Sequence, residues 1–377
     1  MTHPTLPHLD PAAIEALSGR SLLLTTEYSD TDLAALLSVA QAFEALDLAG
    51  VHTGLLHNEL AYALFFDQST RTKSAWAGAA ARLGMQPVIV DGGSTQVSHG
   101  ETAVETGAML GMNAHALGVR HDLILGQGNS FMRDIKRGID DYLAGTEQDR
   151  TVPIVNLQCD IDHPTQTLAD LMWLKERVGD LRGKRIAVSW AYSPSYAKPL
   201  SVPQGLIMLL PRFGAHVTLA HPEGYALLPE CTKAAEEGAQ RSGGSFRIAD
   251  TMDAAFEGAD VVYPKSWGPM DLMLERVAAK DRDTMADIER RALERNAKFR
   301  DWICDERRMA LTAGGNALYM HCLPADIGAE VSPGVMEKYR LDLAREAQKK
   351  VYVVMALLAA AKVSDLAGRL SELEAGR

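Results

Sequence analysis

The sequence has few cysteines and none of the spacings that disulfide frameworks or metal sites require. Its four cysteines, Cys159, Cys231, Cys304 and Cys322, lie far apart and form no CxxC pair. We therefore expect no disulfide framework and a reduced, cytoplasmic setting. No HExxH motif and no clustered set of His and Cys residues is present, so we expect neither a metal site nor a cofactor.

Segments that would direct a chain to a membrane are also missing. The stretch Met1–Pro7 has neither the basic region nor the apolar core of a signal peptide. The longest apolar candidate, Val351–Val363, is too short to span a bilayer and is typical of a buried helix. The formal net charge of −11 argues against a nucleic-acid-binding surface. A local cationic pocket in an acidic protein can still bind a small anion.

The glycine patterns of nucleotide-binding proteins are absent. There is no GxxxxGK[ST] loop, and Gly126-Gln127-Gly128 lacks the third glycine of a dinucleotide fingerprint. The stretch 189–193, which follows a predicted strand, contains no glycine where a Rossmann turn needs several. A nicotinamide-dependent dehydrogenase is therefore disfavoured.

Strand and helix patterns alternate along the chain, which indicates parallel sheets flanked by helices. Of the 377 residues 47% are hydrophobic and 23% charged, as in soluble globular proteins, and this length allows two domains. We predict an α/β fold with two domains, each a parallel sheet flanked by helices, and place the transition at the polar stretch 179–184. The predicted strands are 61–66, 86–91, 114–120, 153–158, 185–190, 216–220, 260–263 and 317–321. The predicted helices lie near 11–17, 31–46, 74–83, 101–112, 129–142, 167–178, 203–213, 225–241, 252–257, 284–299 and from 332 to the C-terminus.

One stretch, Phe65–Lys73, places three hydroxyls, an arginine and a lysine between a predicted strand and a predicted helix. The N–H groups at a helix N-terminus attract anions, and an arginine adds a fork that matches phosphate. The stretch thus suits a phosphate cradle. The alternative is an ordinary helix cap at Ser69 or Thr70 followed by a solvated arginine.

Four more polar clusters follow predicted strands: Arg120, His163–Gln166, Lys265–Gly268 and His321–Pro324. Taken singly, each has a simpler explanation as a surface ion-pair residue, a turn, a solvated lysine or a buried thiol. Ligands of parallel α/β sheets bind at the carboxyl ends of the strands. Together the clusters therefore predict a cleft between the two domains.

Four of these motifs, in this order and spacing, resemble the aspartate/ornithine carbamoyltransferase family: Ser-Thr-Arg-Thr at 69–72, Arg120, His-Pro-Thr-Gln at 163–166 and His-Cys-Leu-Pro at 321–324. The resemblance covers nearly the whole chain. It implies carbamoyl phosphate bound between two α/β domains, and catalytic trimers with active sites at subunit interfaces. It also implies a carbamoyl-phosphate domain at 1–166, joined by a C-terminal helix at about 345–377, and an amino-substrate domain at 180–344.

The finer resemblance is to the knotted branch, which includes the N-acetylornithine and N-succinylornithine transcarbamylases. Within that branch, residues 156–162, 190–204 and 263–268 are most similar to a group whose physiological substrate was long unassigned. The resemblance implies a deep trefoil knot in the second domain, formed by Ser193–Pro199 and the region after Gly268.

The resemblance also implies roles for individual residues. The phosphate would be held by Ser69, Thr70, Arg71 and Thr72. The carbonyl oxygen would be polarised by Thr72, Arg120 and His163, as an oxyanion site does. Gln166 and the backbone carbonyls of Cys322 and Leu323 would accept hydrogen bonds from the carbamoyl NH2. Lys350 would replace an arginine of the family, and Cys322 would bind substrate without acting as a nucleophile.

The acceptor side departs from the ornithine enzymes. Lys265-Ser266-Trp267-Gly268 stands where they have an Asp and a Ser-Met-Gly loop, and a lysine there repels a second ammonium and attracts a carboxylate. His99, on a loop expected to reach a neighbouring subunit's site, stands where a Lys is usual. We therefore expect an amine-bearing acid, such as a short diamino acid or a ureido-product precursor, rather than ornithine or aspartate. The other hypothesis is a catalytically silent homologue that binds anions as a regulatory or scaffolding trimer.

Overall fold

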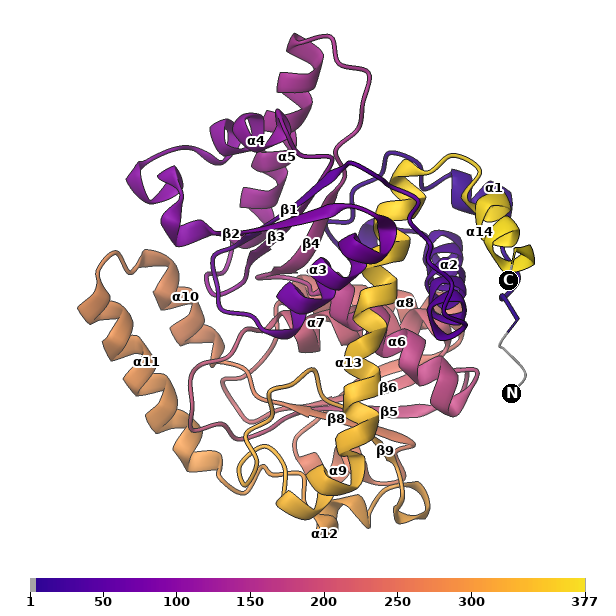
Figure 1. The fold of residues 1–377 in the computed structure, drawn as a ribbon. Helices are drawn as coiled ribbons and strands as arrows, with labels where there is room; N and C mark the ends of the chain where they lie inside the picture. Colours follow the sequence, from indigo (N-terminus) through magenta and orange to yellow (C-terminus); the bar gives the residue numbers. More distant parts are fainter. Residues whose placement is uncertain (1–4, 377) are drawn as a thin grey trace.

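The chain folds around two parallel sheets, one in each half of the sequence (Figure 1). The computed structural model describes residues 5–376. The first sheet has the order β2-β1-β3-β4, and the second has the order β7-β6-β5-β8-β9. The strands are β1 Leu60–Phe65, β2 Gln86–Asp91, β3 Ala116–His121, β4 Ile154–Cys159, β5 Arg185–Trp190, β6 His216–Ala220, β7 Ser245–Ala249, β8 Val261–Lys265 and β9 Leu318–Tyr319. The predicted α/β class with two parallel sheets is confirmed.

Helices fill most of the connections between the strands. The α-helices are α1 Pro11–Glu15, α2 Asp30–Leu48, α3 Arg71–Leu83, α4 Ala103–Gly111, α5 Gly128–Gly145, α6 Pro164–Val178, α7 Ser201–Leu209, α8 Pro229–Ser242, α9 Met252–Phe256, α10 Met270–Ala278, α11 Arg282–Asn296, α12 Glu306–Met309, α13 Pro333–Lys362 and α14 Leu366–Ala375. Short 3-10 turns include η1 Thr25–Glu27, η2 Gly92–Ser94 and η3 Gln96–His99.

Several elements differ from the sequence prediction. Strand β7 and helices α10 and α12 were not predicted, and the final helix is not continuous to the C-terminus. Helix α13 ends at Lys362, and α14 begins after Asp365, which has φ 49°. The Asp365 carboxylate accepts the N–H of Gly368 at 3.3 Å and so starts a new helix in another direction.

The strand register brings the predicted polar clusters to one edge of each sheet. Phe65 pairs with Arg120, and Arg120 pairs with Gln158, so β1, β3 and β4 end side by side. In the second sheet Trp190, at the end of β5, pairs with Lys265, at the end of β8. Parallel strands therefore deliver their following loops to a common place.

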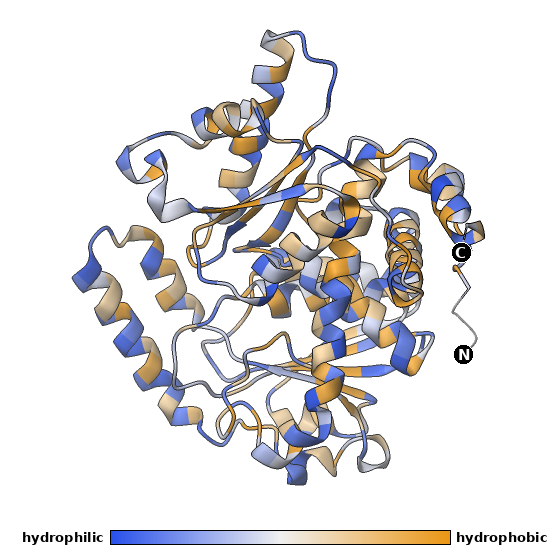
Figure 2. Ribbon diagram, viewed as in Figure 1, coloured by the Kyte–Doolittle hydropathy of each residue, from blue (hydrophilic) through white to orange (hydrophobic). Residues whose placement is uncertain are grey.

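Helix α13 connects the two halves of the molecule and runs past both sheets (Figure 1, yellow). Near its start the Tyr339 hydroxyl donates to the Ala317 carbonyl of the second half at 2.7 Å. Further along, α13 packs against α2, α3 and α6 of the first half. There the buried Lys349 Nζ lies 2.5 Å from Glu44 and also pairs with Glu176. In Figure 2 much of α2 and parts of α13, the two helices that pack here, are coloured as hydrophobic.

The regions where the resemblance places the knot lie next to each other. The N–H of Gly268 donates to the carbonyl of Lys198 at 2.9 Å. The knot itself stays a prediction. Over residues 5–376, no helix combines the length and apolar character needed to cross a membrane.

Candidate active site

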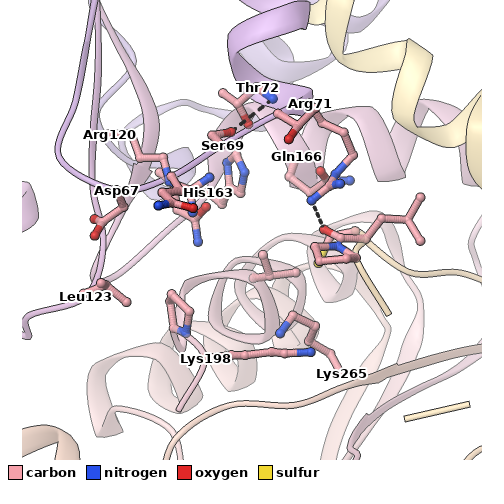
Figure 3. A pocket seen from close by; sticks show the side chains of 18 of the residues that line it. Asp67, Ser69, Arg71, Thr72, Arg120, Leu123, His163, Gln166, Lys198 and Lys265 are labelled. Carbon is pink, nitrogen blue, oxygen red and sulfur yellow. Dashed lines mark hydrogen bonds between the residues drawn. The ribbon is translucent and has the colours of Figure 1, made fainter. Parts of the chain in front are cut away.

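A cavity of about 630 Å³ lies between the loops that follow the strands of the two sheets. In Figure 3 the side chains of the first half face Lys198 and Lys265 of the second half across this space. The lining residues are Phe66, Asp67, Gln68, Ser69, Thr70, Arg71, Thr72, Arg120, Leu123, Gln158, His163, Gln166, Tyr196, Lys198, Pro199, Val202, Lys265, Cys322, Leu323, Pro324 and Lys350. Every residue predicted for the carbamoyl phosphate site is among them.

The loop before α3 combines a helix cap with a set of donors aimed into the cavity. The Ser69 hydroxyl accepts the N–H of Thr72 at 3.3 Å, which is the capping bond considered from the sequence. The Arg71 guanidinium donates to the carbonyl of Leu323, and this bond joins the two halves (Figure 3). The helix cap and the phosphate cradle are thus compatible interpretations of this loop, because the Ser69 bond orients the loop while Arg71 stays at the cavity.

Arg120 is held by an aspartate that the sequence analysis did not single out. Its Nε and Nη2 lie 3.1 and 3.0 Å from the two carboxylate oxygens of the buried Asp122. The N–H of Asp122 in turn donates to the carboxylate of Asp67 at 3.0 Å. A two-pronged pair of this kind fixes the plane of the guanidinium before any ligand arrives.

His163 and Lys350 are two deeply buried titratable groups at the cavity. Burial, with smaller effects of Lys350, Arg120 and Arg71, holds the pKa of His163 well below its usual range, so the imidazole is neutral. Lys350 Nζ donates to the Thr72 hydroxyl at 3.3 Å. Burial and the neighbouring Arg71 lower the pKa of Lys350 to about 7. This concentration of cationic groups suits a multiply charged anion.

A buried carboxyl pair behind the cavity orients Gln166. The Gln166 amide NH2 donates to Asp170 at 2.7 Å, which leaves its amide oxygen as the acceptor. Asp170 also accepts from the Tyr263 hydroxyl at 3.1 Å. Burial raises the pKa of Asp170 to about 6 and that of the adjacent Glu346 well above its usual range. Burial and the nearby Asp170 thus favour the protonated form of Glu346.

On the opposite wall, the buried Glu330 organises two lysines. Lys198 Nζ lies 2.7 Å from Glu330 and 2.9 Å from Asp326. The other Glu330 oxygen accepts the N–H of Ser266 at 2.7 Å, and Lys265 Nζ donates to the Ser266 carbonyl at 2.5 Å. Burial opposes the charged form of Glu330, but its contacts with His321, Lys265 and Lys198 outweigh burial and keep its pKa below the usual range.

The His321–Pro324 motif presents backbone rather than side chains. The N–H of Leu323 donates to His321 Nδ1 at 2.8 Å, so the neutral ring carries its proton on Nε2, which lies 3.5 Å from Glu330. Leu323 has φ 53°, a left-handed conformation that turns its carbonyl toward Arg71. Cys322 lines the cavity beside it.

Three residues predicted for the acceptor side lie outside the cavity lining. Ser266 and Trp267 are fully buried behind Lys265, and the Trp267 indole N–H donates to the Tyr225 carbonyl at 2.8 Å. His99 is exposed on η3, away from the cavity of its own chain. Among the described residues, no group of three or more His, Cys, Asp or Glu side chains could hold a metal ion.

The structure adds lining residues that the sequence analysis did not select, chiefly Tyr196 and Lys198. Both lie on the irregular segment between β5 and α7. The sequence did contain a signal for them, because Ser193–Pro199 is rich in proline and follows a strand end. By contrast, no sequence feature around Glu330 indicated that it would lie near the cavity.

Comparison with known proteins agrees with this geometry. Residues 20–176 match the aspartate/ornithine carbamoyltransferase carbamoyl-P binding domain, and residues 200–361 match the aspartate/ornithine carbamoyltransferase Asp/Orn binding domain. A crystal structure of an N-acetyl-L-ornithine transcarbamylase mutant, complexed with carbamyl phosphate and N-succinyl-L-norvaline, is 26% identical with a TM-score of 0.75, over 90% of this chain and 99% of the other. Ornithine carbamoyltransferase from Pyrococcus furiosus is 27% identical, also with a TM-score of 0.75, over 92% and 97%.

Two relatives are similar over nearly their whole length. YgeW of Escherichia coli strain K12, which carries the provisional name of a carbamoyltransferase, is 46% identical over 95% of this chain and 93% of its own. The N-acetylornithine carbamoyltransferase of Xylella fastidiosa strain 9a5c is 30% identical over 90% and 98%. The chain is therefore a carbamoyltransferase and belongs to the aspartate/ornithine carbamoyltransferase family, in the branch of YgeW and the N-acetylornithine enzymes.

Proposed function

We propose that this carbamoyltransferase moves the carbamoyl group between carbamoyl phosphate and the amine of an amino-acid-like acid, in amino acid metabolism. The observation that carries the proposal is the convergence of Arg71, Thr72, Arg120, His163 and Lys350 on one cavity between the two sheets. We assign the donor to the domain 1–166 together with the C-terminal helix at about 345–377. We assign the acceptor to the domain 180–344.

The donor phosphate would occupy the loop before α3. Ser69, Thr70 and Thr72 offer hydroxyls and backbone N–H groups, and Arg71 offers its guanidinium. In the free protein Arg71 donates to the Leu323 carbonyl, so a bound phosphate would share or take over this arginine. The donor thereby bridges the two halves of the molecule.

The carbamoyl group would lie deeper. Thr72, Arg120 and His163 face its carbonyl oxygen, and Arg120 is held for that role by Asp122. The oxygen gains negative charge as the tetrahedral intermediate forms, and each fixed donor can be worth several kcal/mol, roughly 2.7–4. Gln166, whose free acceptor is its amide oxygen, and the carbonyls of Cys322 and Leu323 would accept from the NH2.

The bond changes need no nucleophilic side chain. The neutral amine of the acceptor attacks the carbamoyl carbon, a C–N bond forms, and the C–O bond to phosphate breaks. The proton that the amine loses goes to the departing phosphate. The protein contributes positioning and fixed charges, which can supply most of the rate.

We propose that the acceptor's carboxylate binds beside Lys265 and Lys198, with Ser266 and Trp267 supporting that wall from behind. Burial, with the nearby Lys198, lowers the pKa of Lys265, and a bound carboxylate would restore its charge. This wall disfavours the second ammonium of ornithine. An amine-bearing acid that brings its carboxylate, and no second free ammonium, to this wall fits better.

The proposed setting is a cytoplasmic homotrimer. Support comes from the family resemblance and from the exposed η3 turn, which carries His99 at a position free to approach another chain. We propose that His99 completes the acceptor site of the neighbouring subunit.

Calorimetry with carbamoyl phosphate tests the donor assignment. We expect the wild-type protein to bind it, and Arg71→Ala to weaken binding by about tenfold to a hundredfold, since hydrogen bonds to charged groups contribute about 1.5–3 kcal/mol. Arg137→Ala, on the exposed face of α5, serves as a control and should bind normally. Equal affinity of Arg71→Ala and wild type would reject the role of Arg71.

A screen of amino acids for phosphate release separates the two hypotheses. Release with one acceptor class identifies the enzyme's substrate. Binding of carbamoyl phosphate without turnover of any amine, in either direction, would favour the silent homologue.

A further inference from the structure

The segment Ser193–Pro199 forms part of the acceptor wall but has no regular structure of its own. It connects β5 to α7 and carries Tyr196, Lys198 and Pro199 to the cavity. Tyr196 is 40% exposed, and its ring lies 5.8 Å from Lys198 Nζ. The shape of the acceptor pocket thus depends on what holds this segment in place.

The two ends of the segment are held by contacts with Asp326, Glu330 and Asn296, the last residue of α11. Asp326 accepts from the hydroxyls of Ser193 and Ser195. Lys198 pairs with Asp326 and Glu330, as described above. The Asn296 amide donates to the Ser193 carbonyl at 3.1 Å. These contacts hold the start and end of the segment.

At the middle of the segment, a carboxylate holds the backbone at Ala197. Glu289 of helix α11 accepts the N–H of Ala197 at 2.6 Å. Ala197 lies between the two lining residues Tyr196 and Lys198, and it is almost fully buried. A charge-assisted bond of this length to a buried backbone N–H is among the stronger kinds of hydrogen bond.

The same carboxylate connects the segment to helix α10. Its other oxygen lies 3.6 Å from Arg276 Nη1, and the arginine is only 9% exposed. Over residues 5–376, Arg276 Nε and Nη1 make no hydrogen bond. Glu289 therefore both balances a buried cation and fixes the acceptor wall, although α11 is mostly exposed, with only Ile288, Ala292 and Asn296 buried.

We propose that Glu289 is a positioning residue that sets the place of Tyr196 and Lys198, and so couples the α10–α11 hairpin to acceptor recognition. It touches neither substrate. The inference rests on the proposed function, because it assigns the segment to the acceptor rather than to the donor. It deepens that function by naming the element outside the cavity that controls acceptor binding.

Three variants test the proposal. Glu289→Ala removes both contacts, Glu289→Gln keeps an acceptor for the Ala197 N–H, and Glu294→Ala changes an exposed carboxylate of the same helix that pairs with Arg290. We expect Glu289→Ala to raise the acceptor KM about tenfold or more, with carbamoyl phosphate affinity unchanged. Glu289→Gln should recover much of this loss, and Glu294→Ala should resemble the wild type.

Hydrogen exchange of residues 193–199 provides a readout that does not depend on turnover. Protection of this segment should fall in Glu289→Ala and persist in Glu294→Ala. Unchanged protection, or an equal rise of KM in both alanine variants, would overturn the role of Glu289. Failure of the wild type to bind carbamoyl phosphate would instead reject the proposed function. The hydrogen exchange of residues 193–199 would then still test whether Glu289 holds the segment in place. If Glu289→Ala does not fold, Glu289→Gln and its exchange pattern carry the test.

Discussion

The cationic side chains of the proposed donor site differ in how they are held, and this decides how each responds to a ligand. Arg120 already has a carboxylate partner in Asp122, and Arg71 has a carbonyl partner. Lys350 contacts only the neutral hydroxyl of Thr72 among the hydrogen bonds described, and its pKa is lowered to about 7 by burial and by Arg71. Its charge state is therefore the one that a bound anion changes most.

Binding of carbamoyl phosphate should take up a proton above pH 7. At pH 8, about nine-tenths of Lys350 is neutral in the free protein, because its pKa is about 7. The bound phosphate stabilises the ammonium and raises the pKa, so affinity falls as the pH rises above 7. Calorimetry at pH 8 in two buffers of different ionisation enthalpy measures the uptake. Lys350→Met should abolish it, and a wild-type enthalpy independent of the buffer would contradict the assignment.

Site residues that lie together in one short motif could be predicted from the sequence. Single residues that pair only across the fold could not. Ser69–Thr72 and His163–Gln166 each place several polar residues directly after an apolar strand. Lys198 and Glu330 are single residues 132 positions apart, and nothing local in either place indicates that they meet. Their pairing exists only because the segment after β5 and the loop before α13 fold together.

Among the secondary-structure elements, helices α4 and α5 approach each other closely, backbone against backbone. A Cβ added at Gly138 of α5 would lie 1.9 Å from the Val104 carbonyl oxygen, and one at Gly107 of α4 would lie 2.2 Å from the Ile135 carbonyl oxygen. These glycines let the helices pack backbone against backbone. The region they support leads from η3 to β3, so it also supports the loop of His99.

Gly138→Ala should destabilise the protein by about 2 kcal/mol. Because the added methyl group would meet backbone, moving the helices apart should cost about 3 kcal/mol, the upper end of the usual range, against the roughly 1 kcal/mol that alanine gains in a helix. Gly145→Ala, at the end of the same helix, meets nothing within 4 Å and should leave stability unchanged or slightly higher. Urea unfolding at fixed protein concentration measures both. A stabilised Gly138→Ala variant would show that the helices yield without cost.

Strand β7 and helix α10 could not be predicted from the sequence, because their partly exposed positions give no clear hydrophobic pattern. Strand β7 is an edge strand in which Ser245, Arg247 and Ile248 are exposed, so it lacks the apolar run of the inner strands. Helix α10 is short, and its exposed Leu274 and Val277 interrupt the polar face expected of an amphipathic helix. The inner strands β5 and β6 were predicted with their observed bounds, because both faces are buried.

For the whole molecule, the proposed trimer predicts that two different defective variants can restore each other's activity when they are mixed in one trimer. If His99 serves the neighbouring site, then Arg71→Ala and His99→Ala trimers should each have little activity at a carbamoyl phosphate concentration that saturates the wild type but not Arg71→Ala. Dissociated and mixed, they should recover about one quarter of wild-type activity, because random trimers contain that share of sites with both native residues. Mixing Arg71→Ala with the double variant is the control and should recover nothing. Full activity of His99→Ala would remove the contribution in trans.

The long helix α13 has a consequence for how the protein is made. It supplies Lys350 to the donor site and buried apolar residues, from Tyr352 to Ala361, to the core around α2 and α6. During synthesis from the amino terminus, the matching faces of α2 and α6 stay open until this late segment leaves the ribosome. Such surfaces are where chaperones bind nascent chains. The core around α2 and α6 and the proposed donor site are therefore completed together, because a chain that ends before α13 lacks both the apolar residues of that helix and Lys350.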